Sequence, residues 1–133
     1  MSPESLTSAG QLLIIFPTVI FGGVSILTLL SRDPRYRQNP LRQQLWRAGH
    51  AHAGVLLVLS LLALLYVDQT DLSVTWKQVV RAAIPASAIL LPAAFFLSVL
   101  SPTATKPNAL IYLAYVGAAA LVIGLIVLGV GLL

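Results

Sequence analysis

Four long apolar stretches, separated by short polar connections, leave this chain few folds to choose from. A bilayer core of about 30 Å is crossed by about 20 helical residues, and each stretch is at least that long. Charged residues make up 9% of the chain and the mean hydropathy is +0.92, so polar side chains are too few to cover a surface that faces water. We therefore expect an all-α integral membrane four-helix bundle in up-down-up-down order, a single transmembrane domain over residues 1–133. The expected helices cover about 6–31, 40–67, 79–100 and 107–133.

Basic residues gather in the connection between the first two stretches. They are Arg32, Arg35, Arg37, Arg42 and Arg47, and Asp33 is the only acid among them. This connection carries a net charge of +4, which equals that of the whole chain. By the positive-inside rule it lies in the cytoplasm and both termini lie outside. Because these cations sit at the edge of an apolar segment, we expect the lipid bilayer as their partner and no nucleic acid.

Most groups that catalysis inside a membrane needs are absent from the sequence. The chain has no cysteine, which excludes disulfides and thiolate metal sites. No Asp or Glu lies well inside an expected helix, so a carboxylate-driven proton pump or antiporter lacks its essential group. No HExxH motif, Ser/His/Asp set or phosphate-binding loop occurs. No complete catalytic constellation is visible, and the sequence leaves open whether the chain is an enzyme.

The two histidines of the chain, His50 and His52, lie together at the start of the second expected helix. At 100° per residue, their side chains point about 200° apart, to opposite sides of that helix. They cannot therefore bind one metal ion from one chain. A zinc site on a helix uses positions i and i+4, so this spacing does not predict one.

Small residues border both imidazoles. Ala53 and Gly54 follow His50 by one turn, and Ala48 and Gly49 precede His52 by one turn. This clearance suits a flat, bulky ligand such as haem, whose commonest axial donor is a neutral imidazole.

Two arginines near the histidines favour the same ligand. Arg42 and Arg47 lie one to two turns away with Trp46, where cations could meet the haem propionates at the membrane edge. The spacing alone leaves a second interpretation open. In it both histidines form hydrogen bonds across helices or to interfacial water, and the small residues only permit close packing.

The second helix, GHAHAGVLLVLSLLALLY, resembles a helix of the haem-copper oxidase catalytic subunit. In that family a His-x-His at the outer start of a transmembrane helix sends its two histidines to two different haems, and twelve helices form three arcs of four. The chain resembles a single arc, as do other small four-helix membrane proteins with such a motif. The resemblance implies that His50 and His52 bind the iron of haem.

The chain also departs from the family. The copper ligands on another helix and the redox tyrosine that follows one of them have no counterpart here, so oxygen reduction is not implied. In the oxidases the start of this helix faces the outside, which conflicts with the positive-inside rule. The orientation of the termini therefore stays open.

The placement of the histidines also bears on assembly. No other expected helix contains a histidine, so a six-coordinate haem needs its second imidazole from another copy of the chain. A closed threefold ring, with each haem between His50 of one chain and His52 of the next, leaves no ligand unpaired. We expect a homotrimer with interfacial bis-histidine b-type haems in a bacterial cell membrane. Its expected role is electron transfer, to a redox partner or a quinone, or haem or gas sensing.

Two alternatives remain from the sequence. Gly117, Gly124 and Gly131 recur every seven residues in the last stretch and form a groove in which another helix can approach closely. We expect this groove to pack within the same four helices, which also suits a cofactor-free structural or accessory subunit of a larger membrane complex. The third alternative is a small oligomeric channel or transporter, with an anion path past Arg81.

Overall fold

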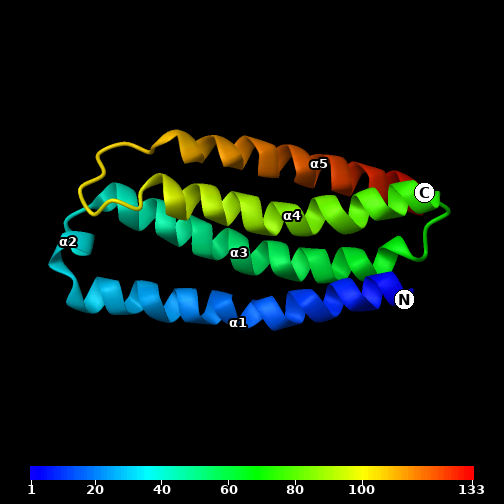
Figure 1. Cartoon of the computed structure of the whole chain (residues 1–133), viewed down its shortest axis with the longest axis horizontal. Coiled ribbons are helices and arrows are strands. Elements are labelled where there is room, and N and C mark those ends of the chain that lie inside the picture. Colours follow the sequence, from blue (N-terminus) through cyan, green and yellow to red (C-terminus); the bar gives the residue numbers. More distant parts are fainter.

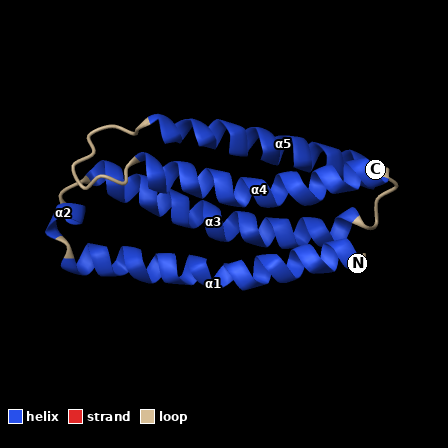
Figure 2. Ribbon diagram, in the orientation of Figure 1, coloured by secondary structure: helices blue, strands red, loops and turns tan.

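The computed structural model describes residues 1–133, and all of its regular elements are helices (Figures 1 and 2). They are α1 (Pro3–Arg32), α2 (Pro34–Arg37), α3 (Pro40–Val67), α4 (Val74–Ser98), the 3-10 turn η1 (Ala109–Tyr112) and α5 (Leu113–Leu132). The spans Pro3–Arg32, Pro40–Val67, Val74–Ser98 and Ala109–Leu132 are long and apolar enough to cross a membrane. The expected all-helical architecture with four long apolar helices is confirmed, and it is consistent with a multi-pass membrane protein.

The start of α3 follows from local chemistry. The side chain of Asn39 accepts a hydrogen bond from the Arg42 amide at 3.0 Å, and Pro40 occupies the first helical position, where its missing N–H costs nothing. This is the start expected from the Asn-Pro pair.

The starts of the last two helices differ from expectation. α4 begins at Val74 rather than near Val79, because polar residues such as Lys77 continue the helix beyond the apolar stretch. Hydropathy marks the extent of the bilayer, whereas a helix can extend past it. α5 begins at Leu113, after the short turn η1, rather than near Pro107.

The long helices form an open row in the order α1, α3, α4, α5, each antiparallel to its neighbours (Figure 1). Helices α1 and α5 do not contact each other. The arrangement is therefore less closed than the compact four-helix unit expected from the short connections. α1 meets the rest of the molecule mainly through α3.

Helix α4 is the centre of the core. One buried cluster joins α1, α3 and α4 and contains Leu12, Leu56, Leu57, Leu64, Ala88 and Leu91. A second joins α3, α4 and α5 and contains Ala63, Val67, Val80, Ile84 and Leu128. Both clusters lie between helices that follow each other in the row.

Three of the four glycines of α5 face the rest of the fold. Gly117 and Gly124 are buried against α4, and a Cβ atom added at Gly124 would lie 2.6 Å from Cγ1 of Ile84. Gly131 meets Leu72 in the α3–α4 connection. The groove therefore packs within the same chain, as expected.

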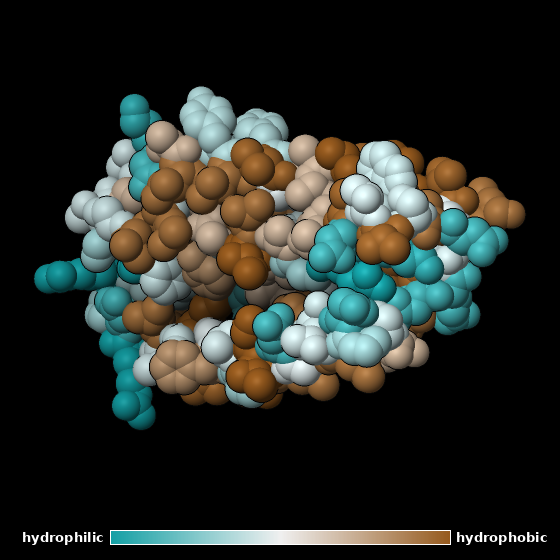
Figure 3. Space-filling model, turned by 45° about the vertical axis from the view of Figure 1, so that its right-hand side comes forward, coloured by the Kyte–Doolittle hydropathy of each residue, from teal (hydrophilic) through white to brown (hydrophobic).

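The charges of the chain separate to its two ends. The α2 end holds six cations and one carboxylate, a net charge of +5, and the end with both termini holds three carboxylates and two cations, a net charge of −1. These sum to the net charge of +4 of the chain. Hydrophilic side chains accordingly protrude at one end and form a patch toward the other, with a largely apolar surface between them (Figure 3).

Candidate functional site

His50 lies half-buried on the side of α3 that faces α1. Its ring rests against a glycine pair of α1: a Cβ atom at Gly23 would be 3.0 Å from Cε1 and 3.1 Å from Nε2 of His50, and one at Gly22 would be 3.7 Å from Nδ1. Because a side chain at position 23 would crowd the ring, Gly23 is what allows α1 to cover this imidazole so closely.

Three hollow regions meet at His50. A groove of about 810 Å³ between α1 and α3 is bordered by His50 and Arg47, and a second groove of about 440 Å³ is bordered by His50 and Gly54. A more enclosed cavity of about 260 Å³ between α1, α3 and α4 is lined by His50 and Ala53. Arg47, Ala53 and Gly54 therefore each border a different one of the three hollows that His50 lines.

His52 lies on the other side of α3, exposed and beside α4, with its ring centroid 5.2 Å from that of Phe95. Its Nδ1 atom is 2.7 Å from the carbonyl oxygen of Ala48. A carbonyl oxygen only accepts, so this contact is a hydrogen bond when Nδ1 carries the proton, which leaves Nε2 with a free lone pair. An imidazole held in this way is prepared to bind a metal ion through Nε2.

Gly49 serves the packing of α3 on α4. It is buried, and a Cβ atom there would lie 3.0 Å from Cε2 of Phe96 and 3.2 Å from Cβ of Phe95. The clearance that the sequence predicted beside His52 at this position is therefore filled by two aromatic side chains of α4.

Arg42 is held by contacts at the α2 end of the fold and does not border the groove beside His50. Its side chain is buried, its Nε donates to the carbonyl oxygen of Val99 at 3.2 Å, and its guanidinium lies 4.2 Å from the ring centroid of Trp46. The fully buried ring of Tyr36 also belongs to this cluster, with its centroid 5.8 Å from that of the Trp46 ring. Of the two arginines proposed for propionates, only Arg47 lines a groove with His50.

Sequence reasoning missed the α1 side of the site. Gly22, Gly23 and Gln44 all border the space around His50. A Gly-Gly pair in the middle of an apolar stretch was the available signal, because small residues mark the places where helices approach closely in a membrane.

Arg81 lies in a polar cluster at the opposite end of the molecule. Its guanidinium pairs with the carboxylate of Asp68 and donates to the hydroxyls of Ser5 at 2.9 Å and Ser2 at 3.1 Å. The backbone amide of Ser2 also donates to Asp68 at 2.6 Å. Burial raises the pKa of Asp68, but the hydrogen bonds from Ser2 and Arg81 outweigh it and lower the pKa to about 2. Arg81 therefore fastens the start of α1 to α3 and α4, and its guanidinium is paired at the place where the anion path was suggested.

Comparison with known proteins adds nothing to this geometry: no protein family, no curated protein and no solved structure matches the chain. Within the chain, no group of three or more His, Cys, Asp or Glu side chains comes together as a metal site.

The two histidines fit haem to different degrees. His52 presents Nε2 as it stands, since it is exposed and its Nδ1 is already bonded. The nitrogens of His50 have no hydrogen-bond partner in the chain, but Nε2 faces the α1 backbone at Gly23. Ligation by His50 requires its ring to turn into the groove that Arg47 and Ala51 border.

Proposed function

We propose that the chain is a membrane b-type haem protein in which His50 and His52 are axial ligands of two different haems. The observation that carries the proposal is the bond between Nδ1 of His52 and the carbonyl of Ala48, at an exposed position. Such a bond fixes the tautomer and the ring orientation of a ligating histidine. The resemblance of this helix to the haem-copper oxidase subunit supports the same assignment.

The groove beside His50 has the polarity that haem requires. It extends between α1 and α3 from Arg47 and Gln44 past the apolar side chains of Ile26 and Leu27. A carboxylate group at the arginine end would gain a charge-assisted hydrogen bond, and the ring would lie against apolar residues. When bound, a haem between two imidazoles supplies one-electron transfer and has no open position for oxygen, so electron transfer is favoured over sensing.

The site is incomplete in one copy of the chain. His50 faces α1 and His52 lies beside Phe95 of α4, so no single ligand can reach both imidazoles. We therefore propose a homotrimer in which each haem lies between His50 of one chain and His52 of the next, which closes the ring without an unpaired ligand. The open row leaves the outer flanks of α1 and α5 free for contact with other copies. We assign this assembly to a bacterial cell membrane, with a redox protein or a quinone as electron partner.

Absorption spectroscopy of protein purified from haem-replete cells tests the proposal. We expect a Soret band and a low-spin spectrum, and native mass spectrometry should give three chains with up to three haems. His50→Ala and His52→Ala should each abolish the low-spin spectrum, because every haem in the ring needs one ligand of each kind. Gln11→Ala, an exposed polar position on α1, is the control and should leave the spectrum unchanged.

Three outcomes would contradict the proposal in whole or in part. A stable but colourless protein favours the cofactor-free accessory subunit, and an unchanged spectrum in both histidine variants places the haem elsewhere. A stable monomer or dimer with full haem content excludes the trimer while leaving haem binding intact.

A further inference from the structure

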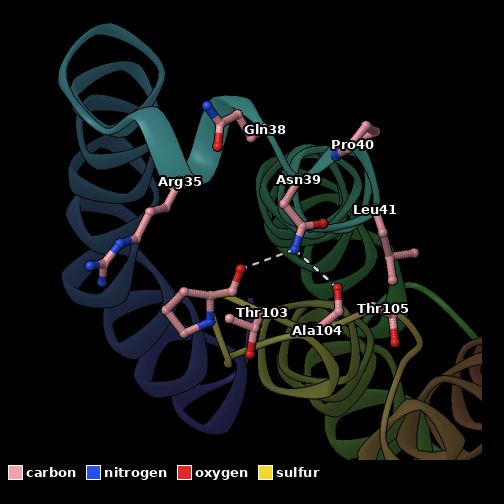
Figure 4. Close-up of a pocket in the computed structure, with 9 residues that line it drawn as sticks. Arg35, Gln38, Asn39, Pro40, Leu41, Thr103, Ala104 and Thr105 are labelled. Atoms are coloured by element: carbon pink, nitrogen blue, oxygen red, sulfur yellow. Dashed lines mark hydrogen bonds between the residues drawn. The ribbon is translucent and has the colours of Figure 1, made fainter.

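The basic end of the molecule contains a hollow of about 560 Å³ outside the His50 region (Figure 4). Its lining comes from two connections that are far apart in the sequence: Arg35, Gln38, Asn39, Pro40 and Leu41, and Pro102, Thr103, Ala104 and Thr105. The side-chain amide of Asn39 donates to the carbonyl oxygens of Pro102 at 3.2 Å and Ala104 at 3.0 Å (Figure 4). The two walls are therefore fixed to each other, and the hollow is a built feature of the fold.

The lining is rich in hydrogen-bond donors and holds no carboxylate. The guanidinium of Arg35 is exposed and unpaired, since the single ion pair of the chain joins Arg81 and Asp68. The amide of Gln38 and the hydroxyls of Thr103 and Thr105 border the same space. Asp33 lies nearby, but its carboxylate accepts from the Arg35 amide at 2.9 Å and does not line the hollow. This combination suits an anion with several oxygen atoms.

The position of the hollow determines which anion can reach it. Helix α1 ends at Arg32, α3 begins at Pro40 and α4 ends at Ser98, so the hollow lies at the level where the apolar spans end. The net charge of +5 at this end attracts anionic lipids, and basic pockets at this depth suit lipid head groups. The start of α3 also borders the hollow, where the helix dipole favours negative charge.

We infer that this hollow binds the phosphate group of an anionic phospholipid, with Arg35 as the charged ligand and Thr103, on the facing connection, as a hydrogen-bond donor. The inference is independent of haem binding, because none of these residues borders the space around His50. Colourless protein should therefore retain the lipid.

Native mass spectrometry of the full-length protein with equal amounts of phosphatidylglycerol and phosphatidylcholine tests this inference. We expect preferential retention of phosphatidylglycerol, and Arg35→Gln should reduce it about tenfold through loss of a charge-assisted contact. Arg37→Gln is the matched control, because it removes the same charge from the same short helix at a position that does not line the hollow. Thr103→Val should lower retention by about threefold without any change of charge.

Two results would overturn the inference. Equal losses in Arg35→Gln and Arg37→Gln would mean that the basic end attracts anionic lipid without a specific site. Release of phosphatidylglycerol by millimolar inorganic phosphate would assign the hollow to free phosphate, whereas retention of the lipid supports the head-group site. Unchanged helical circular dichroism in phosphatidylcholine confirms that each variant is folded.

Discussion

The imidazole of His50 occupies the space that a side chain at Gly23 would need. A Cβ atom at position 23 would lie 3.0 Å from Cε1 of His50, whereas one at position 22 would make an ordinary contact of 3.7 Å with Nδ1. A methyl group would therefore be tolerated at position 22 but would crowd the His50 ring at position 23. The close contact between α1 and this ring depends on Gly23 alone.

Substitution of this glycine tests the contact. Gly23→Ala should destabilise the protein by up to about 1 kcal/mol, because the new methyl group forces the imidazole to shift by a few tenths of an ångström, which outweighs the gain in helix propensity. Gly22→Ala, one residue away, is the control and should cost much less. The measurement is the free energy of unfolding in mixed micelles. The combination of Gly23→Ala with His50→Ala should recover most of the loss; additive losses would mean that the ring is not what the methyl group meets.

Stability should fall at acid pH because of Asp68. The pKa of Asp68 is lowered from 3.8 to about 2 in the folded chain, so its carboxylate stabilises the fold above pH 3.8. This contribution is lost as the pH falls toward 2, when the carboxylate takes up its proton. With allowance for solvent screening at this end of the chain, we expect the free energy of unfolding to fall by about 1–2 kcal/mol over this pH range.

Unfolding free energies between pH 5 and 2 would show this loss. Asp68→Asn should be less stable at pH 5 and should lose less between pH 4 and 2 than the unaltered chain. Asp71→Asn, at an exposed position in the same connection, should follow the unaltered chain. Parallel curves for the unaltered chain and Asp68→Asn would exclude Asp68 as the source.

The packing of α5 on α4 should be disturbed by a methyl group at Gly124 and not by one at Gly129. Gly124→Ala places a methyl group 2.6 Å from Cγ1 of Ile84, which requires α5 to shift and should cost about 1–3 kcal/mol. Gly129 lies on the same helix with no atom within 4 Å of its Cβ position, so Gly129→Ala should be neutral or slightly stabilising. Thermal unfolding of the two variants in one detergent compares them directly, and equal effects would argue against the packing of α5 seen here.

Removal of one hydroxyl should stabilise the basic end. Tyr36 is fully buried and its hydroxyl has no hydrogen-bond partner in the protein, while burial raises the pKa of that hydroxyl. Tyr36→Phe keeps the ring against Trp46 and removes an unsatisfied polar group, so we expect a gain of about 1 kcal/mol. Tyr112→Phe, at an exposed tyrosine, should have no effect. A loss of stability in Tyr36→Phe would reveal a partner for the hydroxyl.

Much of the fold could be predicted because it depends on local chemistry. The apolar stretches indicate four helices, and Asn39 with Pro40 specifies the start of α3 through a cap that involves neighbouring residues only. The opposite directions of His50 and His52 follow from helix geometry alone. The early start of α4 was missed because Lys77 is polar yet helical.

The surroundings of the site could not be predicted in the same way. Several contacts depend on which helices become neighbours. They are those of Gly23 with His50, of Phe96 with Gly49 and of Arg42 with the carbonyl of Val99. Those contacts join residues far apart in the chain, and no local pattern specifies them.

The weak attachment of α1 has a consequence for how the chain is made. α1 precedes the other helices in the chain, yet its buried residues are only Ser5 and Leu12, and their partners outside α1 belong to helices that follow it. The cluster around Leu12 can form only after α3 and α4 have been synthesised, and the contact between Ser5 and Arg81 only after the start of α4. Until α3 has been made, at about the midpoint of the chain, α1 therefore has no other long helix to pack against, and its polar attachment through Ser5 forms only once Arg81 of α4 has been synthesised.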